Sequence, residues 1–360
     1  MNTPRKRCRE FPIIGRIARG KFQSLEISVL AAVCAAMLVS GCSTVPAQKA
    51  EAVHRVWPPP PASPRIAYVE SIGSPADLGA RVSTWRKLAN FVTGSDRGLE
   101  PFVRPQAVAV DENGNLCVAD PGAGAVGFFD REQKKYFRWT EIGKEPFISP
   151  VSIAKRGDLI FVADTGLRKI IAFDGRGHLS LSITNDIGRP AGIAVSSNRL
   201  FVADAVSNCV LVFDFQGRLL NRFGGRGTGA GTFNGPTHVS LDSEGRIYVS
   251  DSLNFRVQVL DANGNAQAVF GTVGDASGHF GRPKGVAADS FGHVYVVDAL
   301  FDNVQAFDRS GHFLLNWGEA GSEPGEFWLP AGIAIDKDNR MFVADSYNCR
   351  VQVFNYVGQE

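Results

Sequence analysis

The residues best suited to chemistry in this 360-residue chain are aspartates that recur at one place in a repeated pattern. Each ends a short apolar run of the form Val-Xaa-Asp, and the six are Asp120, Asp164, Asp204, Asp251, Asp298 and Asp345. Paired carboxylates can act as general acid and base, but a carboxylate that follows every equivalent strand most simply caps the next turn. We therefore interpret these aspartates as structural residues that cap turns. A catalytic set is a remote alternative.

The histidines do not form a recognisable catalytic or metal-binding set. His178, His293 and His312 fall in predicted hairpin turns, where a solvated imidazole is expected. His238 alone stands near the start of a predicted strand. No Ser-His-Asp or Cys-His arrangement can be placed at one spot from the sequence. We therefore predict no catalytic residue, no metal site and no cofactor.

A fixed repeat positions these residues. Residues 236–271 read as the alternating runs VSL, RIYVSD, RVQVL and AQAVF, separated by turn residues, which predicts a four-stranded antiparallel sheet. The pattern returns 47 residues later and 47 residues later again. A proline opens each unit, at Pro105, Pro150, Pro190, Pro236, Pro283 and Pro330. Six such units predict an all-β, six-bladed β-propeller over residues 101–360.

The units resemble NHL repeats. The resemblance rests on Pro-Xaa-Gly-(Ile/Val)-Ala at residues 190–194, 283–287 and 330–334, on the Val-Xaa-Asp ending of the second strand, and on Asn-Xaa-Arg-Val at residues 254–257 and 348–351. The first two units depart from it, with GAGAV and GLRKI at the last position. NHL repeats form propeller blades, usually six, so the resemblance implies the fold that the repeat count predicts.

Cysteine usage beyond residue 42 predicts no disulfide within the propeller. Cys117 lies in a predicted strand, whereas Cys209 and Cys349 fall in predicted loops of the third and sixth repeats, on opposite sides of a closed ring. A disulfide requires Cα atoms within about 7 Å, so we expect no pair among the three. We interpret them as small buried residues.

The N-terminal 41 residues predict an export signal. Residues 1–26 carry seven Lys or Arg side chains, and an apolar run over residues 27–39 then ends in Val-Ser-Gly-Cys. This run is too short to span a bilayer. Its ending resembles the lipobox of bacterial lipoproteins, which implies that Cys42 is lipidated and becomes the new N-terminus. Ser43 after the anchor implies, by the same resemblance, sorting to the outer membrane. An ordinary signal peptide with an incidental cysteine is the alternative.

Residues 42–64 are predicted to be a linker, and 65–100 to complete the propeller. Residues 58–61 are four prolines, which favour a stiff polyproline II spacer; a disordered tail is the alternative. The sixth repeat lacks a fourth strand, and residues 65–73 carry the missing pattern, so we predict that they close the ring as the outer strand of the last blade. Residues 82–92 have helical spacing and predict a short amphipathic helix.

The loops that follow second strands and those that join blades should share one face. Three blade-joining loops are long and each contains a phenylalanine, Phe233, Phe280 or Phe327, which we interpret as a plug between blades. On this face we predict a partner-binding surface made of Val206, Leu253, Phe255, Leu300, Phe301 and Tyr347, with rim charge from Arg168 and Arg226. A contiguous patch would mark a contact surface, whereas scattered residues would not.

An enzymatic alternative places the site at the mouth of the central tunnel. Some NHL-like propellers resemble zinc lyases that bring three histidines there from the starts of inner strands. His238 occupies such a position, but the equivalent residues are Ala107, Ser152, Gly192, Gly285 and Gly332. One histidine cannot build a zinc site.

The sequence therefore favours a non-catalytic binding or scaffold module for a protein, peptide or glycan partner, lipid-anchored in a bacterial envelope. A hydrolase or lyase is the alternative, and a sensor or accessory subunit a third class. Without residues 1–41 the chain holds 31 basic and 34 acidic residues, which disfavours nucleic acid as a partner.

Overall fold

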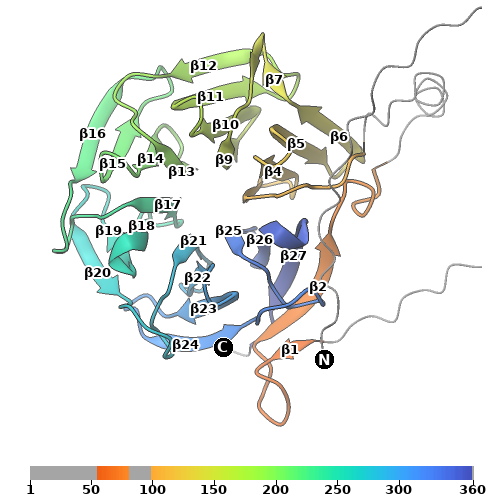
Figure 1. The fold of residues 1–360 in the computed structure, drawn as a ribbon, viewed down its shortest axis with the longest axis vertical. Helices are drawn as coiled ribbons and strands as arrows, with labels where there is room; N and C mark the ends of the chain where they lie inside the picture. Colours follow the sequence, from red (N-terminus) through yellow and green to blue (C-terminus); the bar gives the residue numbers. More distant parts are fainter. Residues whose placement is uncertain (1–54, 81–98, 359–360) are drawn as a thin grey trace, which may run out of the picture. The chain divides into compact units, whose positions relative to one another are not determined.

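Six antiparallel sheets surround a central opening in the computed structural model, which describes residues 55–80 and 99–358 (Figure 1). Five of the sheets have four strands and the sixth has five. Each sheet is one blade of a β-propeller. In the five four-stranded blades the strands run in sequence order from the inside outward, whereas in the sixth two strands from the N-terminal side lie outside the last three strands of the chain. The six-bladed all-β fold predicted from the repeats is confirmed.

The first three blades follow one another along the chain. Blade one contains β3 (Ala107–Val110), β4 (Leu116–Asp120), β5 (Ala125–Asp130) and β6 (Lys135–Trp139). A short hairpin, β7 (Glu141–Ile142) and β8 (Glu145–Pro146), comes next. Blade two contains β9 (Pro150–Arg156), β10 (Leu159–Asp164), β11 (Lys169–Asp174) and β12 (Leu179–Ile183). Blade three contains β13 (Pro190–Val195), β14 (Leu200–Asp204), β15 (Cys209–Phe213) and β16 (Leu219–Gly224).

The last three blades are the more regular ones. Blade four contains β17 (Pro236–Leu241), β18 (Ile247–Asp251), β19 (Arg256–Leu260) and β20 (Ala266–Phe270). Blade five contains β21 (Pro283–Ala288), β22 (Val294–Asp298), β23 (Asn303–Phe307) and β24 (Phe313–Trp317). Blade six contains β25 (Pro330–Ile335), β26 (Arg340–Asp345) and β27 (Arg350–Tyr356), completed by two strands from the N-terminal side.

The innermost strands close the ring. β3, β9, β13, β17, β21 and β25 contact one another in that order, and β25 contacts β3 again. Glycine in the opening Pro-Xaa-Gly pattern has a steric reason here. A Cβ on Gly192 would lie 2.6 Å from the Cα of His238 on the neighbouring inner strand, which is closer than real Cβ atoms come. Gly285 and Gly332 have the same close approach to the next inner strand, whereas His238 occupies the equivalent position of blade four.

A strand from the N-terminal side completes blade six. β2 (Ile66–Ile72) pairs antiparallel with β27, with Ile66 opposite Tyr356 and Ile72 opposite Val351. Ile66 is fully buried in a cluster that also contains Trp317 and Phe354. The segment predicted to close the ring thus holds a strand that covers the edge of β27.

Two expectations about residues 42–73 were wrong. β1 (Val56–Trp57) pairs with β2, so β2 is not the outermost strand of the blade, and part of the predicted linker belongs to the sheet. The four prolines at 58–61 lie in the turn between β1 and β2, where the backbone N–H of Arg65 donates to the carbonyl of Trp57 at 2.7 Å. A hairpin turn holds this run, so it is not a stiff spacer.

Phenylalanine plugs the gaps between the later blades as predicted. Phe233, Phe280 and Phe327 are all fully buried, and each lies in a hydrophobic cluster that joins neighbouring blades. Burying such a ring contributes roughly 2 kcal/mol. These residues are structural and do not belong to a binding surface.

The cysteines follow the prediction in part. Cys117 and Cys209 are buried and free, and Cys209 begins β15, although a loop was predicted there. Burial raises the pKa of both thiols, that of Cys209 to about 11. Cys349 is disulfide-bonded, but with neither of these two.

Several predictions fall outside the described residues. They are the signal peptide at 1–41, the lipidation site Cys42 and the helix at 82–92. Within residues 55–80 and 99–358, no helix has the length and apolar character needed to cross a membrane.

Candidate functional site

Loops on one face of the ring are held in place by the recurring aspartates. In blade five the carboxylate of Asp298 accepts hydrogen bonds from the backbone N–H groups of Gly281 at 2.7 Å, Arg282 at 3.0 Å and Leu300 at 2.9 Å. The first two donors belong to the blade-joining loop and the third to the loop after β22. Asp298 is fully buried. The scaffold role predicted for these aspartates is confirmed: they join the two sets of loops that form this face, here called the loop face.

The Asn-Xaa-Arg-Val motif fastens a long loop to its blade. In blade four the Asn254 amide donates to the Gly227 carbonyl and to Asp251, each at 2.8 Å. The Arg256 guanidinium donates to Asp251 at 2.8 Å and to the Thr232 carbonyl at 2.9 Å. Blade six repeats the arrangement with Asn348, Arg350 and Asp345. The motif is therefore structural, and it makes the loop face rigid.

Exposed apolar side chains recur on the loop face. Val206, Leu253, Leu300 and Tyr347 are 64%, 62%, 59% and 41% exposed. Three of them lie directly over a glycine of the blade-joining loop, because a Cβ on that glycine would lie within 3.1 Å of the side chain: Val206 over Gly188, Leu253 over Gly235 and Leu300 over Gly281. In blade six Tyr347 instead packs on Trp328, with ring centroids 5.6 Å apart. The glycines thus provide room for these side chains.

Blades one and two also pair an apolar side chain with a glycine, but the two residue types exchange places in the sequence. There the glycine follows the aspartate, at Gly122 and Gly166, and the apolar side chain comes from the blade-joining loop, as Val103 and Ile148. Val103 is 44% exposed and Ile148 57%. Each of the six blades therefore presents one apolar residue, a set we call the apolar ring: Val103, Ile148, Val206, Leu253, Leu300 and Tyr347. Sequence reasoning missed Val103 and Ile148, although Gly122 and Gly166 at the expected apolar position were the signal.

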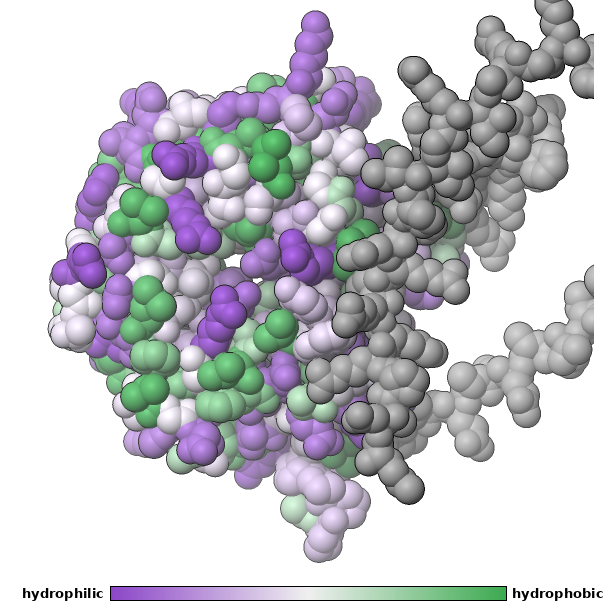
Figure 2. All heavy atoms as spheres, viewed as in Figure 1, coloured by the Kyte–Doolittle hydropathy of each residue, from purple (hydrophilic) through white to green (hydrophobic). Residues whose placement is uncertain are grey.

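The residues of the apolar ring are spaced around the loop face and do not form one continuous patch. Figure 2 shows hydrophobic side chains in clusters spaced around the ring, with hydrophilic ones near the central opening. Phe301 lies beside Leu300, since both would contact a Cβ on Gly281. The prediction for Phe255 was wrong: its side chain packs against the buried cluster of Val257 and Phe280.

The two arginines predicted at the rim are exposed. Arg168 precedes β11, in the left-handed conformation with φ 55°. Arg226 lies in the loop between β16 and β17, where its backbone forms an isolated parallel β-bridge with Phe233. Both lie outside the residues that line the pocket described next.

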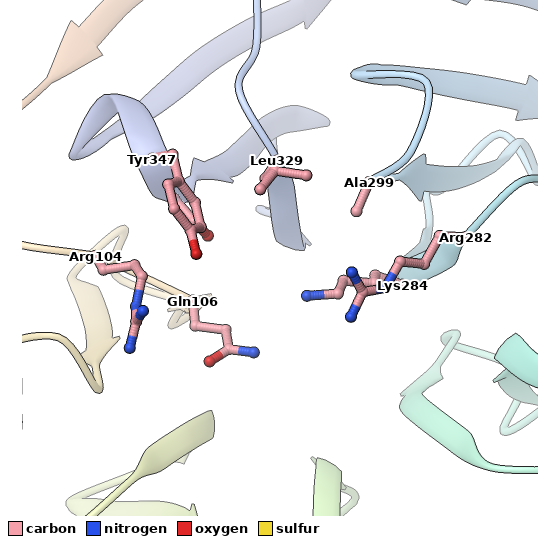
Figure 3. Close-up of a pocket in the computed structure, with 8 residues that line it drawn as sticks. Arg104, Gln106, Arg282, Lys284, Ala299, Leu329 and Tyr347 are labelled. Atoms are coloured by element: carbon pink, nitrogen blue, oxygen red, sulfur yellow. The ribbon is translucent and has the colours of Figure 1, made fainter. Parts of the chain in front are cut away.

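A basic pocket, here called the mouth pocket, lies among loops of blades one, five and six. It has a volume of about 190 Å³ and is lined by Arg104, Gln106, Arg282, Lys284, Ala299, Leu329, Ser346 and Tyr347. Figure 3 shows Lys284 and Arg282 extending together from one side, and Arg104 with Gln106 on the opposite side. Three cationic side chains and no carboxylate line it.

The electrostatics of the mouth pocket are those of an anion site. Burial and the positive charges of Arg282 and Arg104 lower the pKa of Lys284 to about 8. Within the described residues no carboxylate forms an ion pair with these three side chains. Sequence reasoning missed the pocket. The signal was the placement of Arg104 and Arg282 directly before an opening proline, and of Lys284 directly after one, because these positions meet where the inner strands begin.

His238 faces the tunnel below the mouth. The tunnel encloses about 240 Å³ between the six inner strands, and His238 is one of its lining residues. Neither ring nitrogen has a hydrogen-bond partner among the described residues. Burial and the charge of Lys284 lower the pKa of His238 to about 3, so the imidazole is neutral at physiological pH. In the described ranges no group of three or more His, Cys, Asp or Glu side chains could hold a metal ion.

The hairpin histidines occupy the turns predicted for them. The backbone N–H of His178, His293 and His312 donates to an aspartate four residues earlier, and each ring lies within 3.0 Å of the same carboxylate. They complete turns and do not converge on the mouth pocket.

Comparisons with known families agree with this architecture. Residues 178–266 match the family described as 6-bladed beta-propeller, and residues 327–354 match the NHL repeat. A 130-residue stretch is 30% identical to Protein brain tumor of Drosophila melanogaster, which is 34% of this chain and 12% of that protein. The matched stretch thus spans about an eighth of the relative. The chain contains an NHL repeat within a six-bladed propeller.

Solved structures share the fold at low sequence identity. A streptogramin B lyase has a TM-score of 0.54 and 13% identity, over 70% of this chain and 93% of that chain. The virginiamycin B lyase from Staphylococcus aureus has a TM-score of 0.53 and 14% identity, over 71% and 95%. Kuenenia stuttgartiensis hydrazine synthase has 0.52 and 14%, over 71% and 96%. At this identity the likeness establishes the fold alone.

Proposed function

We propose that this protein is a non-catalytic binding module, anchored by lipid in a bacterial envelope, that captures a protein, peptide or glycan partner on its loop face. The observation that carries the proposal is the apolar ring, in which every blade exposes one apolar side chain at an equivalent position. Exposed apolar residues scattered at random need no explanation, but a set repeated with the symmetry of the ring does. Among these three classes of partner, the NHL repeat favours a protein.

The energetics suit a specific but reversible contact. Burying one side chain of this size contributes roughly 1.5 kcal/mol, so several blades engaged together suffice for micromolar affinity after the cost of association. The contacts are spaced around a rigid face held by buried aspartates such as Asp298. A rigid surface loses little conformational entropy on binding.

The anchor is the second part of the proposal. The basic and apolar segments before Cys42, and the Val-Ser-Gly-Cys ending, support lipidation of that cysteine and a periplasm-facing position, with Ser43 favouring the outer membrane. Labelled palmitate should be incorporated into the full chain and not into Cys42→Ser. Equal incorporation in both would exclude an anchor at Cys42.

A hydrolase or lyase using the tunnel mouth is the alternative. It is favoured by the tunnel cavity of about 240 Å³ and by His238 on its wall. Metal analysis of the purified protein decides between the two. Stoichiometric zinc or calcium that is lost in His238→Ala would favour the enzyme.

The central test removes apolar contacts from the loop face. In the full chain, Leu253→Asp combined with Leu300→Asp should reduce capture of an envelope partner at least tenfold, because each aspartate must be desolvated in the contact. The partner is identified by crosslinking and mass spectrometry, purified, and titrated against both proteins. Leu179→Asp is the matched control, since Leu179 is 55% exposed but lies on β12 at the outer edge of blade two.

The outcomes separate a binding defect from a folding defect. Both variants should unfold at the temperature of the wild type, because the substituted residues are exposed. Unchanged affinity of the double variant for the purified partner would overturn the role of the apolar ring. Equal loss with Leu179→Asp would show a general effect of added charge.

A further inference from the structure

The mouth pocket holds three cationic side chains that no carboxylate of the described residues neutralises. Arg104, Arg282 and Lys284 come from blades one and five and share one small cavity. The recurring aspartates of blades one and five, Asp120 and Asp298, are buried and accept hydrogen bonds from the backbone N–H groups of Arg104 and Arg282. These two carboxylates are occupied by loop backbone, so among the described residues no carboxylate pairs with the three cationic side chains, which can therefore attract an external anion.

This arrangement opposes folding. Bringing two guanidinium groups beside a half-buried ammonium is unfavourable, as the lowered pKa of Lys284 shows. Groups that destabilise the folded protein while pointing into an open pocket are typical of a binding site. An anion that enters the pocket would relieve the repulsion and gain charge-assisted hydrogen bonds.

We propose that the mouth pocket binds a carboxylate of the partner, carried by an acidic peptide segment whose neighbouring residues are apolar. This inference rests on the proposed function, since it names the chemistry of the partner that the loop face captures. The carboxylate would lie among Arg104, Arg282 and Lys284, and the amide of Gln106 offers a further donor.

The surroundings of the pocket favour a peptide over a nucleic acid. Leu329, Ala299 and Tyr347 line the same cavity, and Leu300 of the apolar ring directly follows Ala299. Apolar side chains beside a single cationic cluster match an acidic residue with apolar neighbours. A nucleic acid presents a row of phosphates and requires an extended basic surface, whereas the chain after residue 41 is slightly acidic.

The test uses defined probes with the full chain in detergent. Titration calorimetry is run with the blocked tetrapeptide Leu-Glu-Glu-Leu, its Leu-Gln-Gln-Leu counterpart, inorganic phosphate and a single-stranded oligonucleotide. The acidic tetrapeptide should bind and the glutamine form should not. Lys284→Met should weaken binding at least tenfold. Arg199→Met, which removes an exposed cation in the turn between β13 and β14, outside the pocket, should leave it unchanged.

Each outcome supports or overturns the proposal. Equal binding of both tetrapeptides, or no effect of Lys284→Met, would overturn it. Phosphate or the oligonucleotide binding through Lys284, with no binding of the acidic tetrapeptide, would replace a carboxylate by a phosphate ligand. Leu253→Asp with Leu300→Asp should lose the whole partner but keep the tetrapeptide, so failure of the binding surface and failure of the anion site remain distinguishable.

A pH profile distinguishes direct contact from a structural role of Lys284. Its charged neighbours are Arg104 and Arg282, with Tyr347 in the lining of the pocket and the neutral His238 close enough to interact with its charge. Because the pKa of Lys284 is about 8, affinity for the acidic tetrapeptide should fall roughly tenfold between about pH 7 and pH 9. Lys284→Met should show a flat profile.

Discussion

At the scale of single residues, this propeller holds two titratable side chains, Lys284 and His238, at positions where burial disfavours their charged forms. Lys284 is half-buried beside two arginines, and His238 lines the tunnel with neither ring nitrogen hydrogen-bonded within the part of the chain that the structure describes. In both, burial disfavours the charged form and lowers the pKa. Both residues lie near the start of neighbouring inner strands, β17 and β21, and the charge of Lys284 acts on His238.

Lys284→Met should stabilise the protein at neutral pH. The pKa of Lys284 falls from 10.5 to about 8 on folding, so its charge opposes folding below pH 8 and this penalty is relieved between about pH 8 and 10.5. The variant should gain about 1–2 kcal/mol in free energy of unfolding at pH 7, with a smaller gain at pH 10. Urea unfolding at both pH values measures this. A less stable variant at pH 7 would show that the ammonium has an unrecognised partner.

His238→Leu should make the protein more tolerant of acid. The pKa of His238 is lowered from 6.5 to about 3, so only the unfolded chain takes up this proton between those values and stability is lost as pH falls. Between pH 7 and pH 5 the variant should lose about 1–2 kcal/mol less than the wild type. An identical pH dependence of unfolding in both proteins would mean that water in the tunnel solvates the imidazole.

At the scale of elements, the loop face is built by side chains that act on loop backbone. Gln258 of β19 is fully buried; its amide donates to the Thr232 carbonyl at 2.6 Å, and its carbonyl accepts from the Gly231 N–H at 2.8 Å. Gln305 and Gln352 make the equivalent contacts in blades five and six. Buried glutamines of the third strands therefore hold the long loops against their blades.

Gln258→Leu should loosen one loop of the face. The change leaves the Gly231 N–H without its partner and removes one of the two donors to the Thr232 carbonyl, which costs roughly 1–3 kcal/mol. Hydrogen exchange should increase at residues 225–233 and remain unchanged in blade two. Gln216→Leu is the control, because Gln216 is exposed in a hairpin of blade three. Unaltered exchange in the Gln258 variant would assign the rigidity of the loop to Phe233 alone.

At the scale of the whole molecule, the ring closes in blade six, where β2 from the N-terminal side pairs with β27, the last strand of the chain. β2 covers the edge of β27, and Ile66 on β2 packs with Trp317 of blade five and Phe354 of β27. Contacts between inner strands run without a break around the ring. The propeller should therefore unfold as one cooperative unit, in which a defect at the closure affects every blade.

Ile66→Ala should lower the free energy of unfolding by about 2–5 kcal/mol, because it leaves a cavity in a fully buried cluster. The unfolding transition should stay single and shift to lower denaturant concentration. Val69→Ala on the same strand is the control, since Val69 is 42% exposed and should cost less than about 1 kcal/mol. Equal small effects would mean that β2 contributes little to closure.

The blade count, the blade pattern and the scaffold role of the aspartates could be predicted from the amino-acid sequence. A period of 47 residues and the Val-Xaa-Asp ending express local rules, alternation and turn chemistry, that each blade satisfies within its own strands. For the same reason Phe233 was correctly assigned to packing.

Which residues share the loop face became clear from the folded ring. Val103 joins the apolar ring because it lies over Gly122, and Phe255 leaves the surface because it packs inward. Arg104 and Lys284 are 180 positions apart and meet only when the ring closes. Contacts between blades depend on the curvature and closure of the ring, which no single repeat encodes, so the mouth pocket could not be predicted from the pattern alone.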